Sequence, residues 1–224
     1  MERALAARLP GAHTAPARLH EAMRYCVLDA GPRLGPAFLF ATARTVGLRE
    51  EDVEAAACAI ELMHAYSLVH EGLLDVNEAD PRRARRPCHE AYDAATAILV
   101  GDALPPLAFQ LLALDPTLAA EPTVRLRLID LLAQASVASA APGEPRHGAG
   151  GNALRVLDSG ALLRAGVLMA AECAASIDAH QHAALARFAA AIGRALHGEA
   201  LDALRPFGDR AALLHGLADS LSKP

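Results

Sequence analysis

Apolar residues recur every three to four positions along most of the chain, the spacing that places them on one face of an α-helix. Stripes of this kind run through residues 19–27, 34–46, 53–67, 89–114, 123–140, 152–176 and 180–204. No segment shows a convincing alternation of apolar and polar residues, which is the pattern of a half-buried strand, and no internal repeat is evident. The pattern therefore predicts an all-α fold.

Glycine and proline, which start or end helices, fall between these segments, for example at Gly31-Pro32, Gly47 and Pro87. The connections are short, which favours antiparallel neighbouring helices. The exception is residues 141–152, APGEPRHGAGGN, whose glycine and proline content predicts a flexible loop. Since no charged or low-complexity linker divides the chain, residues 1–224 are expected to form a single helical domain.

Composition and charge narrow the fold class and the kinds of partner that the chain can bind. Hydrophobic residues make up 53% of the chain but aromatic residues only 4%, and tryptophan is absent, so the apolar side chains are mostly alanine and leucine. This composition favours helices, because strands prefer β-branched and aromatic residues. The 21 Lys and Arg against 26 Asp and Glu give a net charge of −5, which argues against a nucleic-acid partner.

The cysteines and the first residues of the chain indicate the cellular compartment. Cys26, Cys58, Cys88 and Cys173 form no CxxC pair, so they indicate neither a zinc site nor a redox motif and are expected to be thiols in a reducing compartment. The first ten residues carry charges and no apolar signal core, and no apolar run reaches the length of a membrane span. These features predict a cytoplasmic protein without a membrane span.

Several sequence motifs resemble those of a known protein family. Most of them lie in the first half of the chain, and a further one lies at its end. They read AMRYC at 22–26, AGPRLGP at 30–36, MHAYSLVHEG at 63–72, ADPRRA at 79–84, ATAILVGDAL at 95–104 and RPFGDRAALLHGLADSL at 205–221. Together they resemble the trans-prenyl diphosphate synthases, particularly the bacterial farnesyl and geranyl diphosphate synthases, in which the first motifs read AMRYS and GGKRLRP. The resemblance implies an isoprenoid-synthase-like helical bundle, here truncated in its C-terminal half.

The resemblance also implies candidate binding residues. In that family, magnesium clusters held by two facing aspartate-rich motifs neutralise the departing diphosphate, while Arg, Lys and His bind the phosphate oxygens. Carried over position by position, Arg33, His64, Arg82 and Arg83 are residual diphosphate-binding candidates. For the arginine run between Pro81 and Pro87, a solvated loop is the competing interpretation.

The chain departs from the family where the metal should bind. The first aspartate-rich motif, DDxxxxD, aligns with Glu71, Gly72 and Asn77, so only Glu71, with nearby Asp75, remains as a candidate metal ligand. The family's Lys-Thr-Gly turn matches residues 158–160, which begin with an aspartate, and residues 188–204 offer no adjacent pair of acids in place of the second motif. Magnesium is therefore expected only if the protein is active, and otherwise no cofactor.

The sequence thus predicts a prenyl diphosphate synthase-like protein of the polyprenyl synthetase family that lacks both aspartate-rich motifs. It is expected to be catalytically inactive or impaired and to act as a binding or regulatory subunit, as a homodimer or as a heterodimer with an active prenyl diphosphate synthase. Two alternatives stay open. One is an active prenyltransferase with an altered Mg²⁺ site built from Glu71, Asp75, Glu78 and Asp80, and the other is a carrier that binds isoprenyl diphosphates or prenyl chains.

Overall fold

The computed structural model describes residues 1–74, 86–140, 151–193 and 197–222, with the backbone alone for 74, 138–140, 151–159 and 222. Within these ranges every regular element is a helix, which confirms the all-α class. The elements are α1 (Glu2–Arg8), α2 (Ala17–Val27), α3 (Leu34–Thr45), α4 (Glu50–Leu74), α5 (Cys88–Ala91), α6 (Ala94–Leu114), α7 (Pro122–Ala140), α8 (Gly151–Cys173), α9 (Ala179–Gly193), α10 (His197–Ala203), the 3₁₀ helix η1 (Arg205–Ala211) and α11 (Ala212–Ser222).

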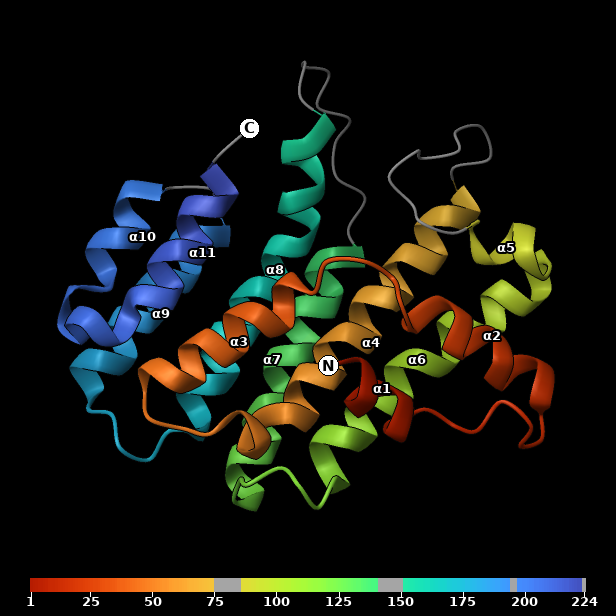
Figure 1. Ribbon diagram of the computed structural model, residues 1–224, viewed down its shortest axis with the longest axis horizontal. Coiled ribbons are helices and arrows are strands. Elements are labelled where there is room, and N and C mark those ends of the chain that lie inside the picture. Colours follow the sequence, from red (N-terminus) through yellow and green to blue (C-terminus); the bar gives the residue numbers. More distant parts are fainter. Residues whose placement is uncertain (75–85, 141–150, 194–196, 223–224) are drawn as a thin grey trace.

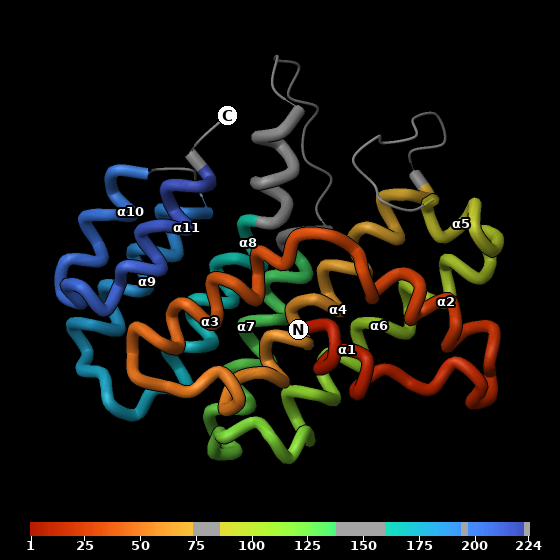
Figure 2. The backbone as a smooth tube through the Cα atoms, in the orientation of Figure 1, coloured from red at the N-terminus to blue at the C-terminus, as the bar shows by residue number. Residues whose placement is uncertain are grey.

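The long helix α4 lies at the centre of the bundle, and α3, α6, α7 and α8 pack against it (Figure 1). Small residues make this possible, because the run Ala55, Ala56 and Ala57 is fully buried and lets neighbouring backbones approach closely. Helices α9, α10 and α11 gather on one side of the molecule, and α2 and α5 lie on the opposite side (Figure 2).

The buried side chains form two clusters. The first, around α4, takes in residues of α1, α2, α6 and α7, and the second joins η1 to α9, α10 and α11. Helices α3 and α8 contribute to both, since Leu39 belongs to the first cluster and its neighbour Phe38 to the second. The ring of Phe38 packs against Phe188 of α9 with centroids 6.2 Å apart. The bundle is therefore held by two cores that share α3 and α8.

Three boundaries differ from the expected ones. The stripe at 89–114 is two helices, because Asp93 begins a new one: its carboxylate accepts the backbone N–H of Thr96 at 2.6 Å, an N-cap. The stripe at 180–204 is likewise divided into α9 and α10. Helix α8 already begins at Gly151, inside the predicted loop of 141–152, while residues 141–150 lie outside the described residues.

Helix α1 has no counterpart among the predicted stripes, and Arg8 at its end ties it to the bundle. The guanidinium of Arg8 donates to Asp115 at 2.7 Å, to Glu54 at 3.1 Å and to Thr117 at 2.8 Å. Tertiary contacts therefore stabilise a helix too short to be stable on its own.

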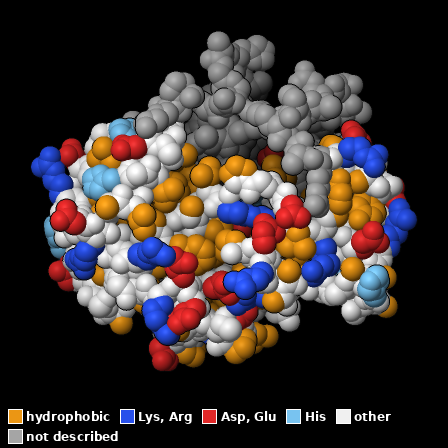
Figure 3. All heavy atoms as spheres, in the orientation of Figure 1, with side chains coloured by type: hydrophobic (Ala, Val, Ile, Leu, Met, Phe, Trp, Pro, Cys, Tyr) orange, Lys and Arg blue, Asp and Glu red, His pale blue; other side chains and the backbone are white. Residues whose placement is uncertain are grey.

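The surface is mixed in charge and apolar in places. On the face shown in Figure 3, positive and negative side chains are interspersed, which agrees with the modest net charge of −5. Large apolar side chains are exposed on α6 (Ile98, Leu99, Leu114) and on α7 (Leu126, Val137). Among the described residues, α6 is also the one helix long and apolar enough to cross a membrane by length and composition, a test that a core helix of a soluble protein can pass as well.

Candidate functional site

Arg33 is the N-cap residue of α3, and its guanidinium is held by two acids. It donates to the carboxylate of Glu61 on α4 at 2.5 Å and to that of Glu2 on α1 at 2.5 and 3.1 Å. It also donates to the backbone carbonyl of Val27 at 2.7 Å. These four bonds direct the donors of a predicted diphosphate-binding residue to partners within the protein.

Glu61 is 2% exposed, so its carboxylate lies inside the bundle. Burial raises the pKa of Glu61 above its usual value, and the contact with Arg33 only partly opposes this. Burial lowers the pKa of Arg33, but its bonds to Glu61 and Glu2 outweigh that effect and raise it overall. We take the pair as ionised because a guanidinium stays charged in proteins and the atoms are within hydrogen-bonding distance.

His64 lies one turn after Glu61 on the same face of α4. Burial lowers the pKa of His64, and the nearby positive charge of Arg33 lowers it further. The imidazole is therefore neutral at neutral pH and does not present a positive charge to a phosphate.

A small cavity lies beside these groups, between α3, α4 and α8. It has a volume of about 40 Å³ and is lined by Pro32, Leu34, Gly35, Ile60, Glu61, His64, Leu162 and Leu163. This is room for one or two water molecules, whereas pockets for small organic ligands usually span about 300–1,000 Å³. Leu162 and Leu163 of α8 contribute apolar side chains to its lining, so the cavity as it stands does not accommodate a diphosphate.

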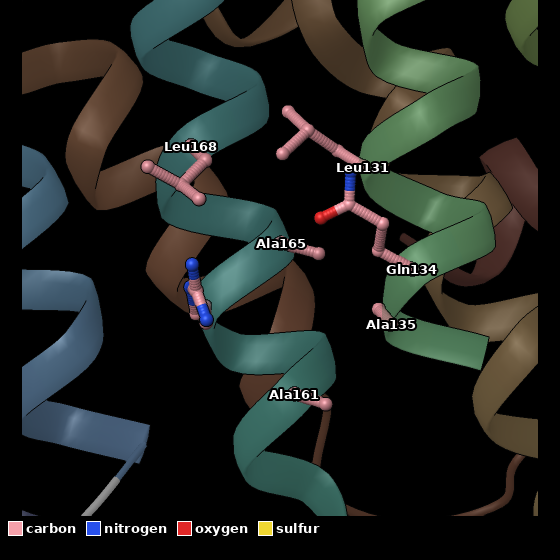
Figure 4. A pocket seen from close by; sticks show the side chains of 7 residues that line it. Leu131, Gln134, Ala135, Ala161, Ala165 and Leu168 are labelled. Atoms are coloured by element: carbon pink, nitrogen blue, oxygen red, sulfur yellow. The ribbon is translucent and has the colours of Figure 1, made fainter. Parts of the chain in front are cut away.

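A second cavity, of about 80 Å³, lies between α7 and α8. Figure 4 shows Leu131, Gln134 and Ala135 of α7 on one side of it and Ala161, Ala165 and Leu168 of α8 on the other. Its lining is mainly apolar, and Gln134 and Arg164 are the polar members. It is separate from the cavity beside Arg33, although α8 lines both.

The end of α4 carries Tyr66, His70 and Glu71. The rings of Tyr66 and His70 meet edge to face at 4.7 Å, and His70 lies directly over Gly101 of α6, where a Cβ atom would be 2.1 Å from its Nε2. Glu71, a predicted metal ligand, is half-buried three residues before α4 ends. The other predicted site residues of this region, Asp75, Arg82 and Arg83, lie outside the described residues.

We tested whether the described residues suit Mg²⁺. In that part of the chain no group of three or more His, Cys, Asp or Glu side chains is arranged to hold a metal. Mg²⁺ favours carboxylate oxygens and the oxygens of bound phosphates, and the Glu61 carboxylate already accepts Arg33. The described residues therefore do not fit a magnesium centre.

Side chains in the region matched to the second aspartate-rich motif also make contacts within the protein. Residues 158–160, which match a turn in the resembling family, lie inside helix α8, where Gly160 packs against the backbone of Gly193. On α10, His197 contacts Asp219 at 3.1 Å and Asp202 contacts Arg205 at 2.8 Å.

His64 lies on a predicted helix, α4, and Arg33 is the N-cap just before the predicted stripe at 34–46. The contact between Arg33 and Glu61 was not predicted from the sequence. The available signal was the position of Glu61 three residues before His64, on the same helical face. Glu2 could not have been anticipated, because its contact with Arg33 depends on how α1 docks.

Comparison with known proteins agrees with the family resemblance seen in the sequence motifs. Residues 16–144 match the model of the polyprenyl synthetase family. A farnesyl diphosphate synthase of Haemophilus influenzae is 40% identical over 134 residues, which is 60% of this chain and 45% of the relative. The chain thus spans less than half the length of this curated relative.

Solved structures match over nearly the whole chain. An FPP/GFPP synthase from Zymomonas mobilis has a TM-score of 0.79 at 26% identity, covering 98% of this chain and 94% of that one. A geranyl diphosphate synthase small subunit from Antirrhinum majus has a TM-score of 0.75 at 21% identity, covering 97% and 95%. These matches confirm the isoprenoid-synthase-like helical bundle, with a C-terminal part truncated relative to homologues.

Proposed function

The chain belongs to the polyprenyl synthetase family, and we propose that it is a catalytically inactive or strongly impaired member that acts as a binding or regulatory subunit in isoprenoid biosynthesis. The observation that carries the proposal is the buried ion pair between Arg33 and Glu61, beside a cavity of about 40 Å³. We further propose that the protein works in the cytoplasm.

Loss of activity follows from what prenyl transfer requires. The leaving diphosphate develops negative charge, and stabilising it takes cations that can reach it in the transition state. Arg33 is bonded to Glu2 and Glu61, and His64 is half-buried with a lowered pKa, so it is neutral at neutral pH. Glu71 remains a carboxylate, but it is followed by Gly72, which supplies no ligand.

A subunit role is supported by the exposed apolar side chains of α6 and α7, two helices that pack against each other. Leu99 and Leu126 are 56% and 67% exposed, and large apolar side chains on exposed helix faces can mark an interface. The occupant we propose is a second copy of this chain or an active prenyl diphosphate synthase. The similar fold of the Antirrhinum majus small subunit suggests this kind of partnering.

The activity test uses the purified full chain with Mg²⁺, isopentenyl diphosphate and each of dimethylallyl, geranyl and farnesyl diphosphate. We expect no elongated product, while an active synthase assayed in parallel turns over. Product formation that is abolished by Glu71→Ala would contradict the proposal and indicate an enzyme with an altered metal site.

The association test compares two leucines of similar exposure on different sides of the molecule. Leu99→Asp is expected to dissociate the homodimer, or the complex with a co-expressed synthase, because a carboxylate would have to be buried in an apolar contact. Leu213→Asp on α11, where the leucine is 50% exposed, is the matched control and should leave the assembly intact. The readout is mass by size-exclusion chromatography with light scattering. A wild-type monomer that ignores the synthase would refute the subunit role.

A further inference from the structure

The two acidic partners of Arg33 differ in how accessible they are. Glu61, which accepts Nη1 of Arg33, is buried inside the bundle. Glu2, which accepts Nε at 3.1 Å and Nη2 at 2.5 Å, has a side chain that is 46% exposed. Glu61 is therefore a fixed internal partner, whereas Glu2 covers the edge of the guanidinium that is turned toward solvent.

The carboxylate of Glu2 is held by three donors. Its Oε1 atom accepts both bonds from Arg33, and its Oε2 atom accepts the backbone N–H of Asp29 at 3.1 Å. Asp29 has a φ of 53°, a left-handed backbone conformation that few residues other than glycine, asparagine and aspartate adopt. The connection between α2 and α3 thus places a backbone donor and the Nε–Nη2 edge of Arg33 around one anion.

These donors favour the ionised form of Glu2. Partial burial opposes ionisation, but the hydrogen bonds from Arg33 and from the N–H of Asp29 outweigh it and lower the pKa of Glu2. Glu2 is therefore a carboxylate at neutral pH. The chain itself supplies the anion that occupies this set of donors.

A phosphate group matches the same donors. Arginine binds carboxylate and phosphate oxygens with one bidentate geometry, and backbone N–H groups in turns contribute to many anion sites. The place taken by the Glu2 carboxylate is open to solvent, unlike the cavity of about 40 Å³ on the other side of Glu61. A diphosphate bound in place of Glu2 would therefore not have to fit into that cavity.

The side chain of Glu2 can move without undocking α1. Glu2 is the first residue of this helix, where the backbone N–H groups have no partner in the preceding turn. The rest of α1 is anchored by the buried Leu5 and by Arg8, which donates to Asp115 at 2.7 Å. A change of rotamer at Glu2 would free one edge of Arg33 while the bonds on its buried side persist.

We propose that Glu2 is an autoinhibitory residue, whose carboxylate occupies the accessible edge of Arg33 and has to move aside before a diphosphate group can bind there. The ligand is inorganic diphosphate or the head of an isoprenyl diphosphate, which share this group. The inference rests on the proposed function, because it describes how the residual binding site of a subunit without turnover is kept closed. Neutralising Glu2 should create binding that the wild-type chain shows only weakly.

The test titrates the full chain with inorganic diphosphate, without Mg²⁺, by isothermal titration calorimetry. Glu2→Gln keeps the length of the side chain and removes its charge. We expect this variant to bind diphosphate about 10–100-fold more tightly than the wild type, which corresponds to releasing one charge-assisted hydrogen bond for the ligand. Geranyl diphosphate is titrated in parallel, and the ratio of the two affinities tells whether a prenyl chain adds contacts.

The variant should remain folded. A partly exposed ion pair contributes little to stability, so the melting temperature of Glu2→Gln should fall by less than about 4 °C. Circular dichroism measures this before the titrations are compared.

Two further variants separate competition by Glu2 from a general change of charge. Glu50 pairs with Arg44 at 2.7 Å and has a side chain that is 46% exposed, as that of Glu2 is. Glu50→Gln should leave the affinity for diphosphate within about twofold of the wild type, because a distant surface charge is screened. Adding Arg33→Lys to Glu2→Gln keeps a positive charge but removes the bidentate fork, so the gain in affinity should disappear.

Two results would overturn the proposal. One is a Glu2→Gln protein that binds neither probe more tightly than the wild type. The other is a gain that Glu50→Gln reproduces or that Arg33→Lys leaves intact. Because no turnover is measured, unchanged affinity here would leave the proposed function standing. Elongated product in the activity test would contradict the proposed function without deciding whether Glu2 blocks Arg33.

Discussion

Replacing Arg33 with methionine is expected to lower the free energy of unfolding by about 3–5 kcal/mol at neutral pH, because it leaves the Glu61 carboxylate buried without its guanidinium partner. Methionine preserves the length and apolar stem of the side chain, so the loss reports mainly on the charge. Glu61 is 2% exposed, and a charge at such a position cannot be compensated by water.

The loss of stability in the Arg33→Met variant should depend on pH. The folded-state pKa of Glu61 is already raised above the usual 4.5 by burial, and removal of Arg33 raises it further. At pH values between the pKa of Glu61 in the unfolded chain and its pKa in the folded chain, the folded chain binds more protons than the unfolded chain. The contribution of Glu61 to stability therefore falls as pH rises through that window. The Arg33→Met variant should therefore recover part of its stability when the solution is made mildly acidic.

Urea unfolding followed by circular dichroism at neutral and mildly acidic pH measures both effects. The control is Arg44→Met, which breaks an exposed ion pair with Glu50 at 2.7 Å and should cost less than about 1 kcal/mol. Equal losses in the two variants would mean that the buried pair contributes no more than a surface one.

Replacing Gly35 with alanine is expected to destabilise the protein by about 1–3 kcal/mol. A Cβ atom at this position would lie 2.6 Å from Cγ2 of Ile60, a fully buried and β-branched residue that cannot turn aside. On the other side, a Cβ atom on Gly166 of α8 would lie 3.0 Å from the carbonyl oxygen of Gly35. Helices α3, α4 and α8 thus meet closely around these two glycines.

Gly35→Arg is the more stringent test, because it restores the second arginine of the GGKRLRP motif of the trans-prenyl diphosphate synthases. We expect it to cost more stability than alanine and to yield no elongated product, since the backbone at Gly35 is packed against Ile60. Thermal and urea unfolding supply the measurement, with Gly216→Ala as the control. No atom lies within 4 Å of a Cβ at Gly216, so that change should be neutral or stabilising by up to about 1 kcal/mol. A Gly35→Arg protein as stable as the wild type would contradict this account of the packing.

Most of the helices could be predicted from sequence, because their stripes are long and bounded by glycine or proline. The interior of α4 and the start of α3 after Pro32 fall where the pattern places them. The division at Asp93 was missed because apolar periodicity runs across it, although an aspartate three residues before Thr96 is a capping signal. Helix α1 could not be found by pattern at all, since it depends on the contacts of Arg8.

The motifs gave candidate residues for the site but not their chemistry, and Asp75, Arg82 and Arg83 lie outside the described residues. Arg33 and His64 were identified through motifs, and both lie beside the same small cavity or in contact with its lining. What the motifs could not reveal is that Arg33 bonds to Glu2 and Glu61 and that burial keeps His64 neutral. Such properties arise from three-dimensional neighbours, which one-dimensional patterns do not encode.

The two cores have a consequence for how this chain can change over evolutionary time. Helices α3 and α8 face a core on two sides, and along residues 161–171 of α8 only Arg164 is exposed. A polar substitution on these two helices is costly on nearly every face. The helices from α9 to α11, which serve only the second core, can drift in sequence with less effect on the first. Divergence should therefore accumulate fastest at the C-terminal end, while α3 and α8 remain constrained.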